Sequence, residues 1–337
     1  MTDQLCIAVD AMSGDLGPAV AVRSSLSFLS RNTSVKILLV GDKTVLAPLL
    51  ANRNSTPSNL AIHHAPDVVA MDDKPSYALR RKQQSSMAVA LKLVKEGQAS
   101  ACVSAGNTGA LMILSRSILR MLPGIDRPAI TKRIPSAQSS CFVLDLGANV
   151  DSSAEHLLQF ALMGSILARC ELDINEPRVA LLNVGEEEVK GNEQVRLASH
   201  LLRESNDLNY VGFVEGGDLF TGVADVIVCD GFVGNVALKT GEGVVSLVLG
   251  EVKQAFQNSW YGKLVGFLAL PLLKAIRKKL APSYHNGATF LGLQGVVIKS
   301  HGGADAFAFE KAIEQAIYAV EKEIPAKINK KLDDWLI

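Results

Sequence analysis

One pattern constrains the fold of this chain more than any other: short apolar runs end in small polar loops, and helical patterns follow. Residues 226–243 show it clearly. The run from Val226 to Cys229 gives way to Asp230-Gly231, and a helical pattern starts at about Val236. This order predicts a strand, a tight turn and a helix N-terminus, the unit from which open α/β sheets are built.

The same unit recurs along the chain. Because strands and helices alternate, the sequence predicts an α/β fold whose mostly parallel sheet is covered by helices on both faces. Ligands of such sheets collect at the carboxyl ends of strands, and the free N–H groups of helix N-termini favour anions. A phosphate-bearing ligand is therefore predicted at polar strand-end loops, which lie at residues 10–17, 104–109, 145–151, 185–193, 215–218 and 230–235.

Three segments receive other interpretations. Residues 123–135 are expected to form a loop that carries Arg127, Lys132 and Arg133, and residues 286–295 a Gly-rich connection before the last strand. The helix predicted at 154–170 is apolar nearly all round, which indicates burial on several sides and suits a subunit interface.

Composition excludes several classes of protein. The chain has 337 residues, 48% of them apolar and 20% charged, as in a globular protein. Lys plus Arg and Asp plus Glu number 34 each, so no overall field favours nucleic acid as a partner. The five cysteines are dispersed, which is typical of reduced thiols in a cytoplasmic protein. No Cys/His cluster has metal-ligand spacing, so no metal is predicted.

The termini and apolar runs bear on localisation. The N-terminus lacks a basic segment followed by a long apolar one, so no signal peptide is expected. No run is long enough to span a bilayer. Residues 264–273, LVGFLALPLL, carry no charge, and Lys274, Arg277, Lys278 and Lys279 follow them. An apolar tip with a basic flank is typical of a helix that lies on a membrane, although a buried hairpin or a dimer contact fits as well.

Common catalytic motifs are absent from the sequence. No GxGxxG opens a helix, no Walker lysine precedes Thr108, and no GxSxG elbow occurs. What remains is a site rich in main-chain donors and poor in nucleophiles. Such a site suits a reaction in which a bound anion is itself the nucleophile.

Five motifs resemble the phosphate acyltransferases of the PlsX type. They are Asp-Ala-Met-Ser-Gly-Asp-Leu-Gly-Pro (10–18), Ser-Ala-Gly-Asn-Thr-Gly-Ala (104–110), Asp-Leu-Gly-Ala-Asn (145–149), Asn-Val-Gly-Glu-Glu with Lys-Gly-Asn-Glu (183–187 and 190–193), and Cys-Asp-Gly-Phe-Val-Gly-Asn (229–235). The resemblance covers nearly the whole chain. One departure is Ser13, where the family usually has Gly; a positive φ at this position would strain a serine.

The resemblance implies a reaction. Inorganic phosphate attacks the thioester of a fatty acyl chain on acyl carrier protein, which gives acyl phosphate for phospholipid synthesis. It also implies a homodimer without an organic cofactor, and a fold similar to isocitrate/isopropylmalate dehydrogenases and phosphotransacetylases. The whole chain, 1–337, would be one catalytic domain with a helical hairpin that protrudes near 250–282 and an inserted apolar and basic tip at 258–282.

The chemistry fits such a site. Phosphate is largely dianionic near neutral pH, and a thiolate with a pKa of about 8.5 leaves readily. The protein must mainly hold phosphate in line and stabilise the oxyanion. Lys190 is predicted to hold phosphate or the oxyanion, and Asn235 to donate its amide to the same charge.

The remaining candidates form two groups. The predicted phosphate-binding residues are Asp10, Gly14, Asp15, Ser104, Gly106, Asn107, Thr108, Gly109, Asn149, Asp230 and Gly234. The predicted contacts to an anionic membrane or to the carrier protein are Phe267, Leu268, Leu272, Lys274, Arg277 and Lys278, which would make the cytoplasmic enzyme peripherally membrane-associated. Alternatives are a phosphotransacetylase-like enzyme acting on acyl-CoA, a decarboxylating dehydrogenase of the same fold, and a non-catalytic lipid- or carrier-binding protein.

Overall fold

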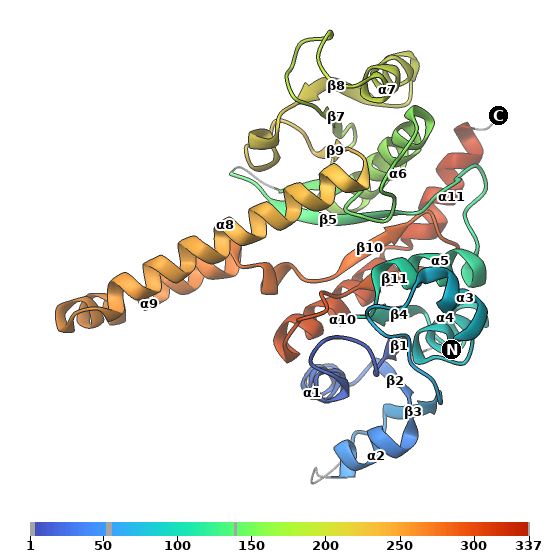
Figure 1. Cartoon of the computed structure of the whole chain (residues 1–337), viewed down its shortest axis with the longest axis vertical. Helices are drawn as coiled ribbons and strands as arrows, with labels where there is room; N and C mark the ends of the chain where they lie inside the picture. Colours follow the sequence, from blue (N-terminus) through green and yellow to red (C-terminus); the bar gives the residue numbers. More distant parts are fainter. Residues whose placement is uncertain (1–3, 52–55, 138–139, 336–337) are drawn as a thin grey trace.

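The structure, a computed structural model, describes residues 4–51, 56–137 and 140–335 (Figure 1). Its centre is an 11-stranded sheet with the order β3-β2-β1-β4-β11-β10-β5-β6-β9-β7-β8. The strands are β1 (Cys6–Asp10), β2 (Lys36–Gly41), β3 (Leu60–His64), β4 (Ala101–Ser104), β5 (Ala129–Pro135), β6 (Ser140–Leu144), β7 (Arg178–Leu182), β8 (Asn209–Val214), β9 (Val226–Val228), β10 (Ala288–Leu291) and β11 (Val296–Lys299).

Helices follow most of the strands. They are α1 (Pro18–Leu29), α2 (Lys43–Ala51), α3 (Pro75–Arg81), α4 (Ser86–Lys95), α5 (Thr108–Leu119), α6 (Ala154–Leu172), α7 (Glu193–Glu204), α8 (Gly231–Gln257), α9 (Trp260–Leu280), α10 (Ala306–Glu321) and α11 (Ile324–Trp335), with 3₁₀ turns η1 (Gly216–Phe220) and η2 (Pro282–His285). The α/β fold predicted from the alternating pattern is confirmed.

The sheet consists of two parallel halves. Strands β3, β2, β1, β4 and β11 are parallel to one another, and so are β6, β9, β7 and β8. Between them, β10 is antiparallel to both β11 and β5, and β5 is antiparallel to β6. The two halves therefore run in opposite directions and are joined through two central strands.

Both central strands lie where the sequence analysis expected loops. Residues 123–135 contain β5, and the Gly-rich stretch 286–295 contains β10. The loop predictions are wrong because prolines flank β5 and glycines flank the short β10, which masks a local strand signal. Long-range antiparallel pairing, such as Thr131 with Thr289, supplies the hydrogen bonds that stabilise them.

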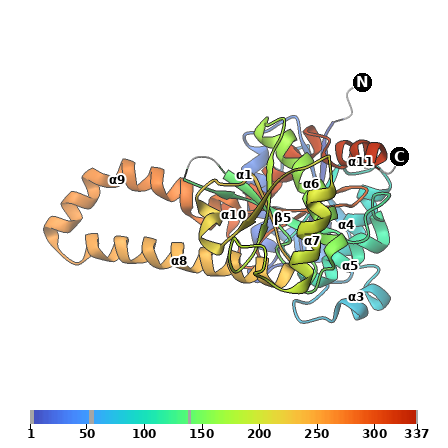
Figure 2. The same ribbon diagram turned by 90° about the horizontal axis from the view of Figure 1, so that it is seen from above.

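Helices cover both faces of the sheet, as Figure 2 shows from above. Ile7 and Val9 of β1 belong to one buried cluster, whereas Cys6 and Ala8 belong to another. Because alternate residues of a strand point to opposite faces, each face has its own apolar core. Helix α6 packs on α7, α11, β6 and β9, so its nearly all-round apolar surface is covered within this chain. All five cysteines are free, and only Cys170 is not fully buried.

Helices α8 and α9 pack against each other and form a hairpin that protrudes from the body (Figure 2). Helix α8 begins at Gly231, five residues before the predicted start near Val236, and α9 ends at Leu280, close to the predicted end of the hairpin at 282. The Asp230 side chain caps it by accepting a hydrogen bond of 2.8 Å from the Val233 backbone N–H. Ser259 caps α9 in the same way through the Gly262 N–H.

Candidate active site

A cleft of about 810 Å³ lies between the two halves, over the central strands. Ile130 and Lys132 of β5, which are two residues apart and so share a strand face, form part of its floor. Four of the six predicted strand-end loops line the cleft, through Asp15, Thr108, Gly147 and Asn235. The loops at 185–193 and 215–218 do not line it. The structure adds two segments, residues 282–288 and 299–305.

A row of polar residues crosses three adjacent strand ends. Asp10 of β1 pairs in register with Ser104 of β4, which pairs with Lys299 of β11. The Asp10 carboxylate is fully buried and accepts hydrogen bonds of 2.6 Å from the hydroxyls of Ser86 and Ser104. Burial raises the pKa of Asp10, and the serine hydrogen bonds oppose that rise. Asp10 and Ser104 thus hold the loops together and do not line the cleft.

Lys299 is the most distinctive charge of the cleft. Its Nζ donates to the carbonyl oxygens of Ala105, at 3.3 Å, and Ser300. Burial, helped by the nearby Lys239, lowers its pKa from 10.5 to about 8. Among the described residues Lys299 forms no ion pair, so an anion in the cleft would meet a cation without a carboxylate partner. Lys299 belongs to none of the motifs in the sequence; the signal for it was a lysine at the last position of an apolar strand.

The loop after β1 meets the loop after β11. The Asp15 backbone N–H donates to the Gly302 carbonyl at 2.9 Å, and Gly14 adopts a φ of 94°. Ser13 is not among the described non-glycine residues with positive φ, so the strain considered for it is absent. Its hydroxyl lies 3.3 Å from the Ser104 hydroxyl, which ties it to the buried network below.

The loop after β4 uses most of its polar groups internally. The Asn107 side chain caps α5 by accepting from the Ala110 N–H at 3.0 Å, and its amide donates to the carbonyls of Met71 and Asp73. The Gly106 N–H donates to the Ser104 hydroxyl at 3.1 Å. Thr108, at the N-terminus of α5, remains as the residue of this loop that lines the cleft.

Close backbone contacts fix the junction between β6 and α8. The buried Asp145 carboxylate accepts from the backbone and the side chain of Asn149, at 2.7 and 2.9 Å. A Cβ on Gly234 would lie 1.9 Å from the Asp145 carbonyl oxygen, and one on Gly231 2.3 Å from the Asn149 carbonyl oxygen. Asn149, Asp230 and Gly234 therefore build the junction, and none of them lines the cleft.

Asn235 is the functional side chain that this junction presents. It is exposed, lines the cleft and lies beside Gly147, whose missing side chain leaves room for it. Within the part of the chain that the structure describes, its amide makes no hydrogen bond. An unpartnered amide at the edge of a cleft is free to donate to a ligand.

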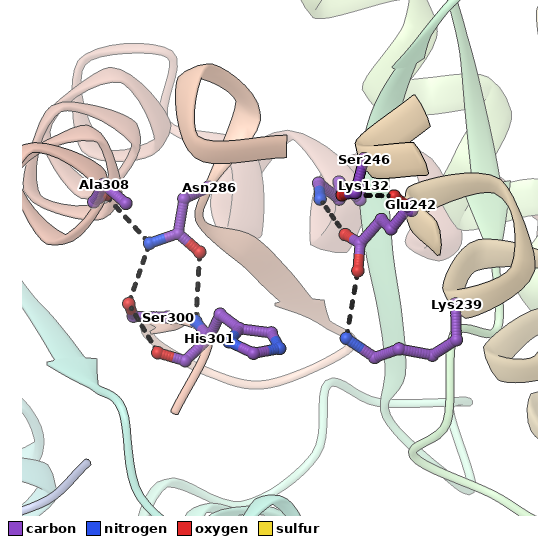
Figure 3. A network of polar contacts seen from close by, with 8 residues as sticks. All are labelled: Lys132, Lys239, Glu242, Ser246, Asn286, Ser300, His301 and Ala308. Atoms are coloured by element: carbon purple, nitrogen blue, oxygen red, sulfur yellow. Dashed lines mark hydrogen bonds and ion pairs between the residues drawn. The ribbon is translucent and has the colours of Figure 1, made fainter. Parts of the chain in front are cut away.

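Two polar networks flank the cleft (Figure 3). On one side, Glu242 of α8 accepts from Lys132 at 2.8 Å and from Lys239 at 3.0 Å. Burial by itself would raise the pKa of Glu242, but Lys132 and Lys239 outweigh burial and hold the pKa below its usual value. Both lysines are thereby partly neutralised, unlike Lys299.

His301 and Asn286 belong to the network on the other side. The His301 backbone N–H donates to the Asn286 side-chain oxygen at 3.0 Å, and the ring Nδ1 accepts from the Gly303 N–H at 3.1 Å. His301 thus forms hydrogen bonds that hold its loop in place. Burial and the nearby Lys239 lower its pKa, so at neutral pH the ring is uncharged and Nε2 carries the proton. In Figure 3 the ring points towards the Lys239 side.

Lys190 does not line this cleft. It is exposed on the loop after β7, where its backbone N–H donates to the Glu187 carbonyl at 3.0 Å and its carbonyl accepts from the Asn183 amide. The strand order β6-β9-β7 separates it from the junction that carries Asn235. Its predicted role stays a prediction.

The distal hairpin exposes its apolar residues. Phe267, Leu268 and Leu272 are 69%, 70% and 70% exposed, and the predicted basic residues Lys274, Arg277 and Lys278 are exposed as well. By length and composition alone α8 could cross a membrane, but its first half lines the cleft. No group of three or more potential metal-ligating His, Cys, Asp or Glu side chains occurs within the described ranges.

Comparisons with known proteins agree with this architecture. A family model described as fatty acid synthesis protein matches residues 5–327. A curated phosphate acyltransferase from Marinobacter nauticus is 57% identical over 331 residues, which are 98% of this chain and 96% of the relative. Its counterpart from Nitrosococcus oceani is 53% identical over 98% of this chain and 97% of its own.

Solved structures share the fold at low sequence identity. A phosphotransacetylase from Streptococcus pyogenes has a TM-score of 0.63 at 17% identity, with 96% of this chain and 95% of that chain covered. A putative 4-hydroxythreonine-4-phosphate dehydrogenase from Salmonella typhimurium has a TM-score of 0.52 at 13% identity, with 94% and 99% covered. The predicted likeness to phosphotransacetylase and dehydrogenase folds is confirmed.

Proposed function

This chain belongs to the fatty acid synthesis protein family that includes the phosphate acyltransferases, and we propose that it transfers a fatty acyl group from acyl carrier protein to inorganic phosphate. Acyl phosphate would be the product, for use in phospholipid synthesis. One observation carries the proposal: the cleft contains Lys299, a largely buried cation that forms no ion pair within the described residues.

The proposed reaction needs little acid–base catalysis. A phosphate oxygen attacks the thioester carbonyl carbon, a C–O bond forms, and the carbonyl oxygen becomes an oxyanion. When the oxyanion collapses, the C–S bond breaks and the thiolate of the carrier leaves with the electron pair. Because phosphate near pH 7 is already largely dianionic, the protein need not remove a proton. Its work is to hold the two reactants in line and to stabilise the oxyanion.

The cleft residues suit these tasks. Lys299 and the N-terminus of α5 at Thr108 would attract phosphate, because both present positive charge or partial charge. The free amide of Asn235 would donate to the developing oxyanion, and the Nε2–H of His301 supplies a second neutral donor. Lys190 remains a proposed anion-holding residue at the end of β7, to be tested with the others.

The hairpin supports proposals about partners. Its apolar tip would lie on the membrane, where the lipidic acyl phosphate is needed, and its basic residues would face anionic lipid or acyl carrier protein. Farther down the hairpin, α8 exposes Val244, Leu247 and Val248, which suits a contact with a second copy in a homodimer. The enzyme would then be cytoplasmic and peripherally bound to the membrane, and it would need no organic cofactor or metal.

A phosphotransacetylase-like reaction on acyl-CoA is the second candidate, because solved phosphotransacetylases share this fold. One assay separates the two. Purified protein receives hexadecanoyl carrier protein or hexadecanoyl-CoA, and free thiol is measured with and without inorganic phosphate. Phosphate-dependent release from the carrier protein, with acyl phosphate seen by phosphorus NMR, is the expected result. Release from acyl-CoA alone would favour the second candidate, and release without phosphate would refute both.

A further inference from the structure

A second, narrow cavity runs beside the cleft. Its volume is about 90 Å³, compared with about 810 Å³ for the cleft. It lies between α8, η1, strands β5 and β6, and the end of α9. Leu146, Leu238 and Pro282 line both cavities, as do Lys132 and Glu242, so the two spaces adjoin each other. We call this narrow cavity the side groove.

The walls of the side groove are mostly apolar. Beyond the residues shared with the cleft, Val143, Leu219, Ala237 and Val245 line it. The charges at its junction with the cleft neutralise each other, because Lys132 and Glu242 form an ion pair of 2.8 Å. A ligand that reaches from the cleft into the side groove must therefore be polar at one end and apolar, slender and unbranched at the other.

We propose that the side groove holds the hydrocarbon chain of the acyl group, and that Phe220 and Gly241 set the preferred chain length. This inference rests on the proposed function. An acyl thioester has the required shape, since its carbonyl would lie in the cleft near Asn235 and its methylenes would enter the groove. Each methylene that leaves water strengthens binding roughly fourfold, so the length of the groove decides which chains bind best.

The Phe220 ring of η1 lies close to Gly241 of α8, and both residues line the side groove; we call this contact the constriction. A Cβ on Gly241 would be only 3.2 Å from Cζ of the Phe220 ring. A glycine in the interior of a helix lowers stability, and Gly241 does not have a positive φ that would require one. The closeness of the Phe220 ring gives a reason for a residue without a side chain at this position.

The test uses a matched pair of substitutions in α8. Gly241→Leu fills the constriction, whereas Gly250→Leu adds the same side chain farther along the helix, where a Cβ would meet no atom within 4 Å. Both changes improve helix propensity, so neither is expected to unfold the protein. Phe220→Ala opens the constriction from the other wall. Phosphate-dependent thiol release is measured with carrier protein that bears octanoyl to octadecanoyl chains.

We expect Gly241→Leu to reduce turnover of hexadecanoyl carrier protein at least roughly tenfold relative to the octanoyl substrate, and Phe220→Ala to shift the preference to longer chains. Gly250→Leu should match the wild type. An equal loss for all chain lengths, or an unchanged profile, would overturn the proposal. Binding of palmitic acid, measured by fluorescence, tests the groove separately from the reaction. If the protein shows no phosphate-dependent activity but Gly241→Leu lowers its affinity for palmitate, the proposed reaction is refuted and the groove proposal stands.

Discussion

Replacing Lys299 by Met should lower activity without lowering stability at neutral pH. The lysine pKa falls from 10.5 to about 8 in the folded protein. At about 1.4 kcal/mol for each pKa unit, the charged form destabilises the folded state by about 3 kcal/mol. Methionine removes this cost together with hydrogen bonds to the carbonyls of Ala105 and Ser300, worth about 2 kcal/mol in all. At pH 7 the variant should thus be as stable as the wild type or about 1 kcal/mol more stable.

The pH dependence has a definite sign. Between the folded pKa of about 8 and the ordinary value of 10.5, the unfolded state binds more protons at this position, so wild-type stability rises with pH. The excess stability of the variant is complete below pH 8 and declines above it. Urea unfolding should show the wild type gain about 2 kcal/mol relative to the variant between pH 7.5 and 9.5, so that the variant is the less stable protein at pH 9.5. Lys95→Met, an exposed change on α4, should show no such trend.

Activity supplies the second half of the test. If Lys299 holds phosphate, the variant should lose about 10²-fold in kcat/KM. Phosphate should also raise the Tm of the wild type, by the equivalent of about 2.7 kcal/mol at a hundredfold excess over Kd, and leave the variant unmoved. Near-normal turnover in Lys299→Met would refute the reasoning. A loss of several kcal/mol at pH 7 would show instead that the lysine is structural.

Three further predictions concern the other parts of the molecule. Asn235→Ala should lower kcat about 10²-fold with an unchanged Tm, because it removes a free hydrogen-bond donor. Lys190→Ala should have the same effect if Lys190 holds phosphate or the oxyanion in the reaction. Steady-state kinetics measures both. Gly234→Ala should destabilise the protein by about 3 kcal/mol in urea unfolding, since its Cβ would lie 1.9 Å from the Asp145 carbonyl oxygen. The double change of Leu268 and Leu272 to Glu should abolish co-sedimentation with anionic vesicles.

Each of these three predictions has an outcome that would contradict it, and two of them have a control variant. Turnover close to wild type in Asn235→Ala or Lys190→Ala removes that residue from the mechanism. Gly250→Ala, in open surroundings on the same helix, should be neutral or stabilising by about 0.5–1 kcal/mol, so a similar loss there would contradict the steric argument. Leu197→Glu on α7, where the side chain is 51% exposed, should leave vesicle binding intact. If the double tip variant still sediments with vesicles, the tip is not the membrane contact.

Local signals were sufficient for much of the fold. Apolar runs such as residues 226–229 and the polar turns after them identified the parallel strands, because each such unit is encoded by neighbouring residues. Strands β5 and β10 escaped for the opposite reason. Each pairs on one side with the next strand along the chain, but the pairing of β5 with β10 joins residues more than 150 positions apart, which no short window of sequence contains.

The site was predicted less completely than the fold. The sequence located polar residues at strand ends but not the direction of each side chain, so Asp10, Ser104 and Asn149, which bind other parts of the protein, could not be told apart from residues that line the cleft. Lys299 was missed because its significance arises from burial and from the absence of a partner among the described residues. Both properties depend on the three-dimensional surroundings.

The order of strands along the chain has a consequence for synthesis on the ribosome. The half formed by β6, β9, β7 and β8 is made as one continuous stretch, whereas β4 must wait for its partner β11 until residues 296–299 emerge. Helix α11, the last element, then packs back onto α6 in the other half. Lys299 and His301 thus reach the cleft only near the end of translation. A truncated chain or a stalled nascent chain would lack these two residues and expose an unpaired sheet edge, which makes it a target for chaperones and proteases.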